Sequence, residues 1–255
     1  MLEVRGLSCG YNGVPVLQDI DFQVPEGRVL VLFGPNGIGK TTLFKTMLGL
    51  LPALGGQVLL DGHRMDLRPS SKDMRSIAYV PQAHTPAFAF SVLEVVLMGR
   101  TAQMHAFATP SANDRAAAEA TLRELGLEDL LGRLYTEISG GERQMVLIAR
   151  ALVQQPRILV MDEPASSLDL GNQSKLLGIA KQLAHERNIS VIMTSHNPDH
   201  ALLVADDVLL MARDGYRVGP ADRILTEELL SHAYGATVRI IGDDVKACAL
   251  QLQGA

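Results

Sequence analysis

A glycine-rich loop near the N-terminus has the residue types and spacing of a phosphate-binding site. Residues 34–41 are Gly-Pro-Asn-Gly-Ile-Gly-Lys-Thr, placed between the apolar run 28–33 and the helix-like stretch 41–48. Glycines let the backbone fold so tightly that its N–H groups converge on phosphate oxygens, and the following helix points its positive end at the same anion. We therefore predict a nucleoside triphosphate site. An ordinary glycine-rich turn is the alternative, and the flanking strand and helix disfavour it.

Two side chains at the end of this loop supply the remaining groups that such a site needs. Lys40 can reach the β- and γ-phosphates, and the hydroxyl of Thr41 can hold a magnesium ion. We therefore expect Lys40 to act in catalysis and Thr41 to be a metal ligand. The predicted nucleotide contacts in and beside the loop are Gly34, Pro35, Asn36, Gly37, Ile38, Gly39, Lys40, Thr41 and Thr42.

A second motif ends another apolar run. Residues 158–163 are Ile-Leu-Val-Met-Asp-Glu, a predicted buried strand that finishes in two carboxylates. Asp162 would hold the magnesium ion through water, and Glu163 would polarise an attacking water as a general base. A capping residue at a strand end is the alternative for Asp162, and the phosphate loop upstream disfavours it.

A third motif, Ile-Ser-Gly-Gly-Glu-Arg-Gln at 138–144, precedes a predicted helix at 145–153. A serine followed by two glycines at a helix start offers free N–H groups and a hydroxyl to an anion. Because the phosphate loop already binds one triphosphate, the two sites suggest that each grips the same nucleotide from opposite sides in a dimer. A capped helix with a glycine turn is the alternative, and the motif alone would favour it.

The composition limits the classes of protein that the chain can represent. Its 255 residues are 47% hydrophobic, enough for a full core, and its formal net charge of −5 argues against a nucleic-acid-binding face. Cys9 and Cys248 are far apart in the sequence, so neither a metal site nor a disulfide framework is expected and a reducing cytosol fits. No signal peptide or transmembrane stretch is visible, so other chains would have to cross any membrane that the protein serves.

The pattern of apolar residues predicts an α/β fold with an antiparallel start. Asn12-Gly13 is a hairpin signal within the first 27 residues, and three continuous apolar runs, 29–33, 158–161 and 190–194, predict parallel strands buried on both faces. Between about 90 and 155 the pattern becomes helical, and Ser91 with Glu94 forms a capping box. We predict a single domain, 1–255, with a helical subdomain inserted at about 90–155.

Together these motifs resemble the nucleotide-binding subunits of ABC transporters, and the resemblance covers nearly all of the chain. Residues 34–41 resemble Walker A, 138–144 the ABC signature and 158–163 Walker B. The signature departs from the commonest form at Ile138 and Glu142, where Leu and Gln are usual. Further matches are the Q-loop glutamine at Gln82, the D-loop at 166–169, the switch histidine at His196 and an adenine-stacking aromatic at Tyr11.

The resemblance implies a P-loop ABC ATPase core and a homodimer of head-to-tail subunits with two ATP molecules and Mg²⁺ between them. The motif of the partner subunit at Ser139, Gly140 and Gly141 would face Walker A, and Asp169 of the D-loop would lie at the nucleotide. Gln82 would be both a catalytic residue and a metal ligand. An ordinary histidine is the alternative for His196, but its place at the end of a predicted strand, where α/β proteins bind ligands, favours catalysis. A hairpin residue is the alternative for Tyr11.

The resemblance also implies partners and a location. Two transmembrane permease subunits and an extracytoplasmic substrate-binding protein would complete the transporter, with no nucleic acid, at the cytoplasmic face of the bacterial inner membrane. Importer, exporter and non-transport relatives remain alternatives, and the chain is most similar to importers. Residues 91–100 and 224–235 resemble importers of ferric siderophores, haem and cobalamin, so we expect a metal chelate as cargo, with a molybdate-type oxyanion as the alternative.

Overall fold

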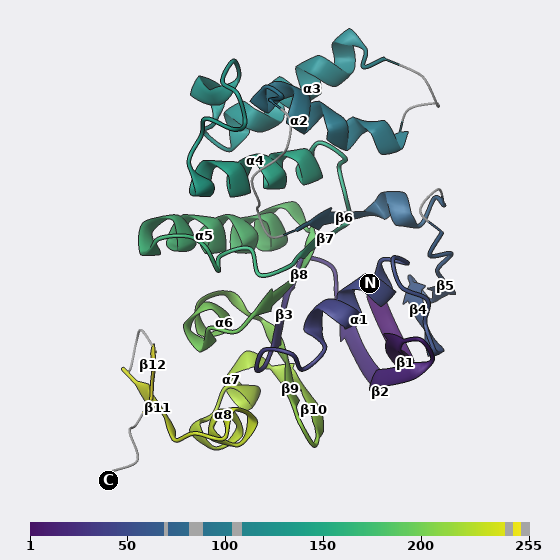
Figure 1. Ribbon diagram of the computed structural model, residues 1–255, viewed down its shortest axis with the longest axis vertical. Coiled ribbons are helices and arrows are strands. Elements are labelled where there is room, and N and C mark those ends of the chain that lie inside the picture. Colours follow the sequence, from purple (N-terminus) through teal and green to yellow (C-terminus); the bar gives the residue numbers. More distant parts are fainter. Residues whose placement is uncertain (69–70, 82–88, 104–108, 243–246, 251–255) are drawn as a thin grey trace.

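The computed structural model describes residues 1–68, 71–81, 89–103, 109–242 and 247–250. Two larger sheets and a set of helices at one end make up the molecule (Figure 1). The predicted α/β class with an antiparallel N-terminal part is confirmed. Gln82, predicted as the Q-loop glutamine, lies outside the described residues.

The N-terminal sheet is antiparallel and has the strand order β2-β1-β4-β5. Asn12 and Gly13 have φ angles of 52° and 78°, and Asp61 and Gly62 have 52° and 81°, the left-handed pairs that tight hairpin turns require. The predicted hairpin at Asn12-Gly13 is therefore confirmed. The four strands are β1 (Leu2–Tyr11), β2 (Val14–Val24), β4 (Gly55–Leu60) and β5 (His63–Arg64).

The central sheet has the order β10-β9-β3-β8-β7-β6, and only β10 runs antiparallel to its neighbour. All three predicted parallel strands are present, and 190–194 extends by one residue to Ser195. Its strands are β3 (Val29–Phe33), β6 (Ile77–Val80), β7 (Ile158–Met161), β8 (Ser190–Ser195), β9 (Asp207–Ala212) and β10 (Gly215–Pro220).

The central sheet is buried on both faces, which explains the continuous apolar runs. Val31 and Phe33 of β3 belong to one hydrophobic cluster, while Leu30 and Leu32 belong to a second. The second cluster also contains Phe44 of α1 (Lys40–Met47), so α1 packs between the central sheet and the N-terminal sheet. The loop before α1 is thereby held at the carboxyl end of β3.

The helices form two groups. Helices α2, α3 and α4 pack on one another at the top of Figure 1, and we propose this group as the subdomain predicted at about 90–155. Among the described residues, none of the helices has the length and apolar character needed to cross a membrane. The helices of the first group and their 3₁₀ turns are α2 (Val92–Leu97), η2 (Met98–Gln103), α3 (Ala112–Glu124), η3 (Glu128–Leu130) and α4 (Gly140–Leu152), and the separate 3₁₀ turn η1 (Met74–Ser76) directly precedes β6.

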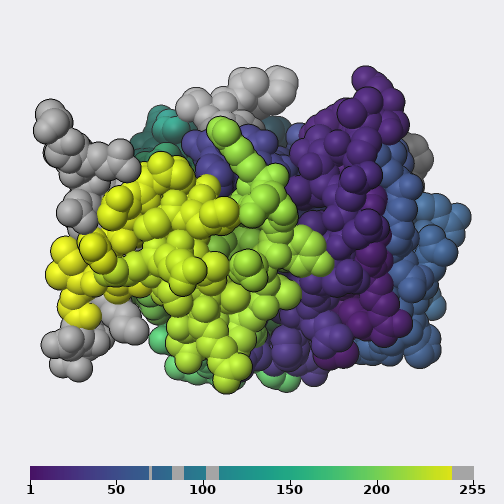
Figure 2. All heavy atoms as spheres, turned by 90° about the horizontal axis from the view of Figure 1, so that it is seen from below, coloured from purple at the N-terminus to yellow at the C-terminus, as the bar shows by residue number. Residues whose placement is uncertain are grey.

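The second group follows β7 in the chain, and its helices pack against β3, β8 and β9 of the central sheet. Figure 2 shows the C-terminal residues in yellow beside the β9–β10 hairpin, with the N-terminal strands in purple on the other side of that hairpin. The elements of this group are α5 (Leu170–Arg187), α6 (Pro198–Val204), α7 (Ala221–Ile224), α8 (Glu227–Tyr234) and the two-stranded sheet of β11 (Val238–Ile241) and β12 (Ala247–Leu250).

Candidate functional site

The glycine-rich loop takes a backbone path that glycine favours. Gly34, directly after β3, has φ +149°, and a Cβ added there would lie 2.5 Å from the carbonyl oxygen of Met211. Gly37 has φ +79°, and Gly39, the residue before α1, has φ +112°. Because L-residues with side chains rarely adopt these angles, the glycines are what allow the loop to curl above the start of α1. The predicted loop contacts Gly34 to Thr42 thus surround one helix N-terminus.

Lys40 turns its amine back into this loop. Its Nζ donates to the carbonyl oxygens of Gly34 at 2.7 Å and Pro35 at 3.1 Å. Only 6% of the residue is exposed, and this burial lowers the pKa of Lys40, an effect opposed by the carboxylates of Glu163 and Asp162. Among the described residues, the hydrogen bonds of this amine run to these two backbone oxygens, which are neutral acceptors. A phosphate oxygen entering the loop would therefore find a cation already in place.

Thr41 and Asp162 converge, as expected of two residues that hold one metal ion. The Thr41 hydroxyl lies 3.4 Å from Oδ1 of Asp162. Hydroxyl and carboxylate oxygens are the donors that Mg²⁺ prefers, and the ion usually keeps several waters besides one or two carboxylates, so this sparse pair fits it. The described residues contain no cluster of three or more His, Cys, Asp or Glu side chains suited to a metal. Any divalent ion bound here would take its remaining ligands from water and from the phosphates of the nucleotide.

A buried hydroxyl fixes the two adjacent carboxylate residues. Thr194, fully buried in β8, donates from Oγ1 to Oδ1 of Asp162 at 2.7 Å and accepts the backbone N–H of Glu163 at 2.7 Å. On the other side, burial raises the pKa of Tyr79 to about 12, and the Asp162 carboxylate adds to this by charge and by a hydrogen bond. Neither Thr194 nor Tyr79 was predicted as a site residue, because a polar residue within an apolar strand gives no signal of its partner.

Glu163 and His196 face each other at the carboxyl ends of two neighbouring strands. Oε2 of Glu163 lies 3.4 Å from Nδ1 of His196, and the two side chains are 25% and 44% exposed. Glu163 has φ +45°, a left-handed backbone that turns the chain sharply after β7. Both residues line a cavity of about 60 Å³, which is large enough for a water molecule. A carboxylate beside a water-sized space is suited to general base catalysis.

A buried histidine, His200, lines the same cavity. His200 contacts Oγ of Ser195 at 3.3 Å through Nδ1 and Oε1 of Gln173 at 3.1 Å through Nε2. Burial lowers the pKa of His200, and the neighbouring His196 lowers it further. The imidazole of His200 therefore links Ser195 to Gln173 through its two ring nitrogens.

Ser139 begins α4 with a reciprocal cap. Its hydroxyl accepts the backbone N–H of Glu142 at 3.2 Å, and Glu142 accepts the N–H of Ser139 at 2.7 Å. The helix therefore starts at Gly140, and the predicted start at 145 is wrong because capping, rather than the first apolar residue, sets the boundary. Ser139 and Gly140 are exposed. In Figure 1, β7 and β8 lie between α4 and α1, so the two predicted anion sites belong to different parts of one chain.

Asp169 lies beside this second site. Its carboxylate caps α5 by accepting from the backbone N–H of Asn172 at 2.9 Å and from the Asn172 amide at 2.7 Å. A Cβ added at Gly141 would meet the same amide at 2.9 Å. Asn172, which the sequence analysis did not single out, thus joins the Asp169 segment to the start of α4.

Tyr11 ends β1 beside α1, with its hydroxyl 3.5 Å from Oγ1 of Thr42. The residue is 46% exposed, so the ring is available to an aromatic ligand. Next to it, a Cβ added at Gly39 would meet Leu17 and Val16 of β2. The N-terminal hairpin therefore forms an apolar edge beside the phosphate loop.

The chain is similar to known proteins in both sequence and fold. The family model described as ABC transporter matches residues 17–166. An uncharacterized ABC transporter ATP-binding protein of Haemophilus influenzae is 40% identical over 242 residues, 94% of this chain and 92% of the relative. The molybdate import ATP-binding protein MolC of the same organism is 35% identical, covering 90% and 86%. A solved structure described as an inward-facing ABC transporter of metal-chelate type has a TM-score of 0.88 at 31% identity, covering 99% and 98%.

Proposed function

The chain belongs to the ABC transporter family as an ATP-binding subunit, an ATPase coupled to transport, and from that premise we propose that it hydrolyses Mg-ATP in a head-to-tail dimer to drive an importer. The observation that carries the proposal is the Glu163 carboxylate, 3.4 Å from His196 and beside a water-sized cavity. This group lies one residue after Asp162, which contacts Thr41 at the phosphate loop.

Each group has one task in the proposed reaction. The loop amides and Lys40 bind the β- and γ-phosphates, and Thr41 with Asp162 would hold Mg²⁺, which supplies positive charge to the phosphate oxygens. Glu163 accepts a proton from the attacking water while the water oxygen bonds to the γ-phosphorus. The bond between that phosphorus and the β–γ bridging oxygen breaks, giving ADP and inorganic phosphate. His196 holds Glu163 and the γ-phosphate in the relative positions that the reaction requires.

The separation of the two predicted anion sites supports the proposed dimer. Ser139, Gly140 and Gly141 offer exposed or half-exposed helix-terminal groups, yet they lie in the helical group, apart from the loop that ends in Lys40. A second copy in head-to-tail orientation would bring this motif to the γ-phosphate, with Asp169 at the interface. ATP then stabilises the closed pair because it contacts both subunits only when they are together.

Ser139→Ala tests the shared site. The hydroxyl would contribute one hydrogen bond to a charged phosphate, a contribution of about 1.5–3 kcal/mol, so turnover should fall about tenfold or more. ATP binding by the monomer should stay within about twofold of the parent, because Lys40 and its loop are untouched. Ser111→Ala is the matched control, since Ser111 caps α3 in the same way without the two glycines. Equal turnover by Ser139→Ala and Ser111→Ala would contradict the shared site.

We propose a metal chelate of the ferric siderophore, haem or cobalamin type as the cargo. The metal-chelate type transporter that covers 99% of this chain at 31% identity supports this choice. Two permease subunits and an extracytoplasmic substrate-binding protein would complete the assembly. The chain would work at the cytoplasmic face of the bacterial inner membrane as a peripheral subunit, without nucleic acid.

A molybdate-type oxyanion is the second candidate cargo, because the molybdate import protein is 35% identical over 231 residues. Co-purification from membranes distinguishes these possibilities. Permease subunits together with a binding protein that holds a metal chelate would support the first cargo, and a binding protein that holds molybdate would support the second. Recovery of the chain with ribosomes or DNA would contradict the transport assignment.

A further inference from the structure

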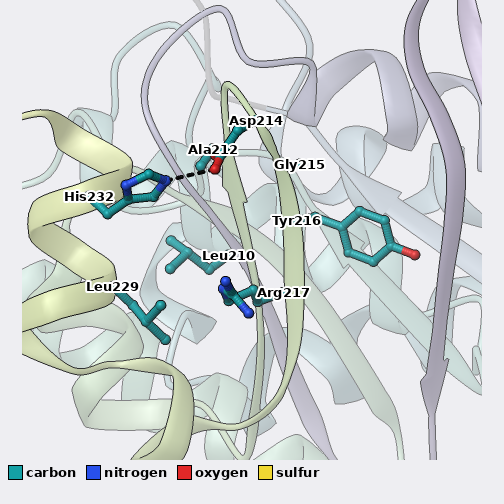
Figure 3. Close-up of a pocket in the computed structure, with 8 residues that line it drawn as sticks. All are labelled: Leu210, Ala212, Asp214, Gly215, Tyr216, Arg217, Leu229 and His232. Atoms are coloured by element: carbon teal, nitrogen blue, oxygen red, sulfur yellow. Dashed lines mark hydrogen bonds and ion pairs between the residues drawn. The ribbon is translucent and has the colours of Figure 1, made fainter.

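The C-terminal helix α8 packs against β9 of the central sheet. His232 in its last turn pairs with Asp214 of the β9–β10 turn at 2.9 Å, and Figure 3 shows this contact across a cavity of about 170 Å³. Thr226 caps its first turn, and Gly235 ends it in the left-handed conformation with φ +62°. Leu230 and Ala233 are buried, so the helix is capped at both ends and packed along one side, which places its last residue, Tyr234, in a defined position.

Tyr234, the last residue of α8, connects this helix to both halves of the proposed hydrolysis site. Its hydroxyl donates to the backbone carbonyl oxygen of His196 at 3.1 Å. Its ring packs against the fully buried ring of Phe33, with centroids 5.5 Å apart and planes at 45°. Phe33 is the last residue of β3 and directly precedes the phosphate loop. Tyr234 therefore contacts the segment that leads into the loop and the residue that faces Glu163.

We propose that Tyr234 is a positioning residue for hydrolysis, which acts by holding the backbone of His196. This inference rests on the proposed function, in which His196 holds Glu163 and the γ-phosphate in the relative positions that the reaction requires. The imidazole of His196 is 44% exposed and its polar contact with Glu163 is 3.4 Å long, so this contact holds the side chain only weakly. The hydrogen bond from Tyr234 holds the same residue through its backbone carbonyl oxygen.

A purely packing role for Tyr234 makes a different prediction. The tilted contact with Phe33 alone would stabilise the fold, and phenylalanine would supply it equally well. Only the hydroxyl reaches the His196 carbonyl. Removing one oxygen atom therefore separates the positioning role from the packing role.

The chain contains a matched control for this change. Tyr216, on β10, donates to the carbonyl oxygen of Asp19 at 3.1 Å and accepts the backbone N–H of Asp21 at 2.8 Å. Figure 3 shows its ring on the side of the hairpin away from His232. Tyr216→Phe removes a hydrogen-bonded hydroxyl of the same kind without touching His196.

The experiment compares the full-length parent, Tyr234→Phe, Tyr216→Phe and His196→Ala. It measures kcat and KM for Mg-ATP, the Kd of a fluorescent ATP analogue and the melting temperature. We expect kcat of Tyr234→Phe to fall about fivefold, the effect of one hydrogen bond of about 1 kcal/mol, with KM and Kd unchanged. Tyr216→Phe should keep the parent kcat, and His196→Ala should lose far more than Tyr234→Phe.

Each other outcome overturns a defined claim. If His196→Ala loses activity but Tyr234→Phe keeps the parent kcat, the positioning role is refuted and the proposed function stands. If both tyrosine variants lose kcat equally, or if KM of Tyr234→Phe rises in proportion, the effect is general loosening or altered binding, and the positioning role is likewise refuted. If the parent hydrolyses no ATP, or if His196→Ala matches it, the proposed function fails and this inference with it.

Discussion

Replacing Glu163 with glutamine removes the proposed general base while preserving its shape. Glutamine has the same length and keeps an oxygen that can accept from His196, which lies 3.4 Å from the carboxylate. The backbone N–H of residue 163 still donates to Thr194. The local fold should therefore survive, and the change is confined to one charge and one proton acceptor.

The size of the effect follows from the task assigned to the carboxylate. A positioned general base contributes about 10²- to 10⁴-fold to a rate, so kcat of Glu163→Gln should fall at least about 100-fold, equivalent to about 2.7 kcal/mol. ATP affinity should stay equal or increase, because the Glu163 carboxylate, whose charge opposes the lowering of the Lys40 pKa by burial, is near enough to the loop to repel the γ-phosphate as well. With ATP bound and not hydrolysed, the closed dimer should accumulate.

Three measurements on one preparation test this prediction. They are phosphate release at saturating Mg-ATP, ATP affinity by calorimetry, and dimer formation by size-exclusion chromatography with ATP. Glu186→Gln, an exposed position near the far end of α5, is the matched control and should behave as the parent. Turnover of Glu163→Gln within about threefold of the parent would refute the assignment of the base.

Two further predictions concern binding and stability. Lys40→Ala should weaken ATP binding by at least about tenfold, because it removes the loop cation and hydrogen bonds of about 1.5–3 kcal/mol, and unchanged affinity by calorimetry would refute this role. Asp114→Asn should lower the urea midpoint at pH 7. The Ser111 and Arg100 side chains hold the pKa of Asp114 at about 2, below its ordinary 3.8, so the stabilisation is present above pH 3.8 and is lost as pH falls through about 2. The difference from the parent should therefore narrow between pH 4 and pH 2, and a constant difference would contradict the electrostatic cause.

Features that depend on neighbours in the sequence were predictable. The pair Asn12-Gly13 specifies its own hairpin because both residues tolerate positive φ, and the observed angles agree. The apolar run 29–33 identified a strand buried on both faces, since every one of its residues packs in a hydrophobic cluster. The loop at 34–41 was recognisable because its glycines and Lys40 are close in the sequence and together form one phosphate-binding pattern.

Features that depend on long-range contacts, and the start of one helix, were not predicted. The pattern gave α4 too late a start, because the cap formed by Ser139 and Glu142 precedes the first apolar residue of the helix. Thr194 reads as an ordinary strand residue until β7 and β8 pair and bring it against Asp162. Tyr234 reads as a helix-end residue until α8 packs on the sheet and its hydroxyl meets His196. Thr194 and Tyr234 act through contacts with residues distant in the chain. The start of α4 is set by polar capping residues, which the spacing of apolar residues does not reveal.

The most direct test of the account is a structure of the Glu163→Gln protein with Mg-ATP. The account predicts a head-to-tail dimer in which each γ-phosphate contacts Lys40 of one subunit and Ser139 of the partner subunit within hydrogen-bonding distance. Nucleotide bound at both phosphate loops, with Ser139 of either copy remote from every γ-phosphate, would contradict the account.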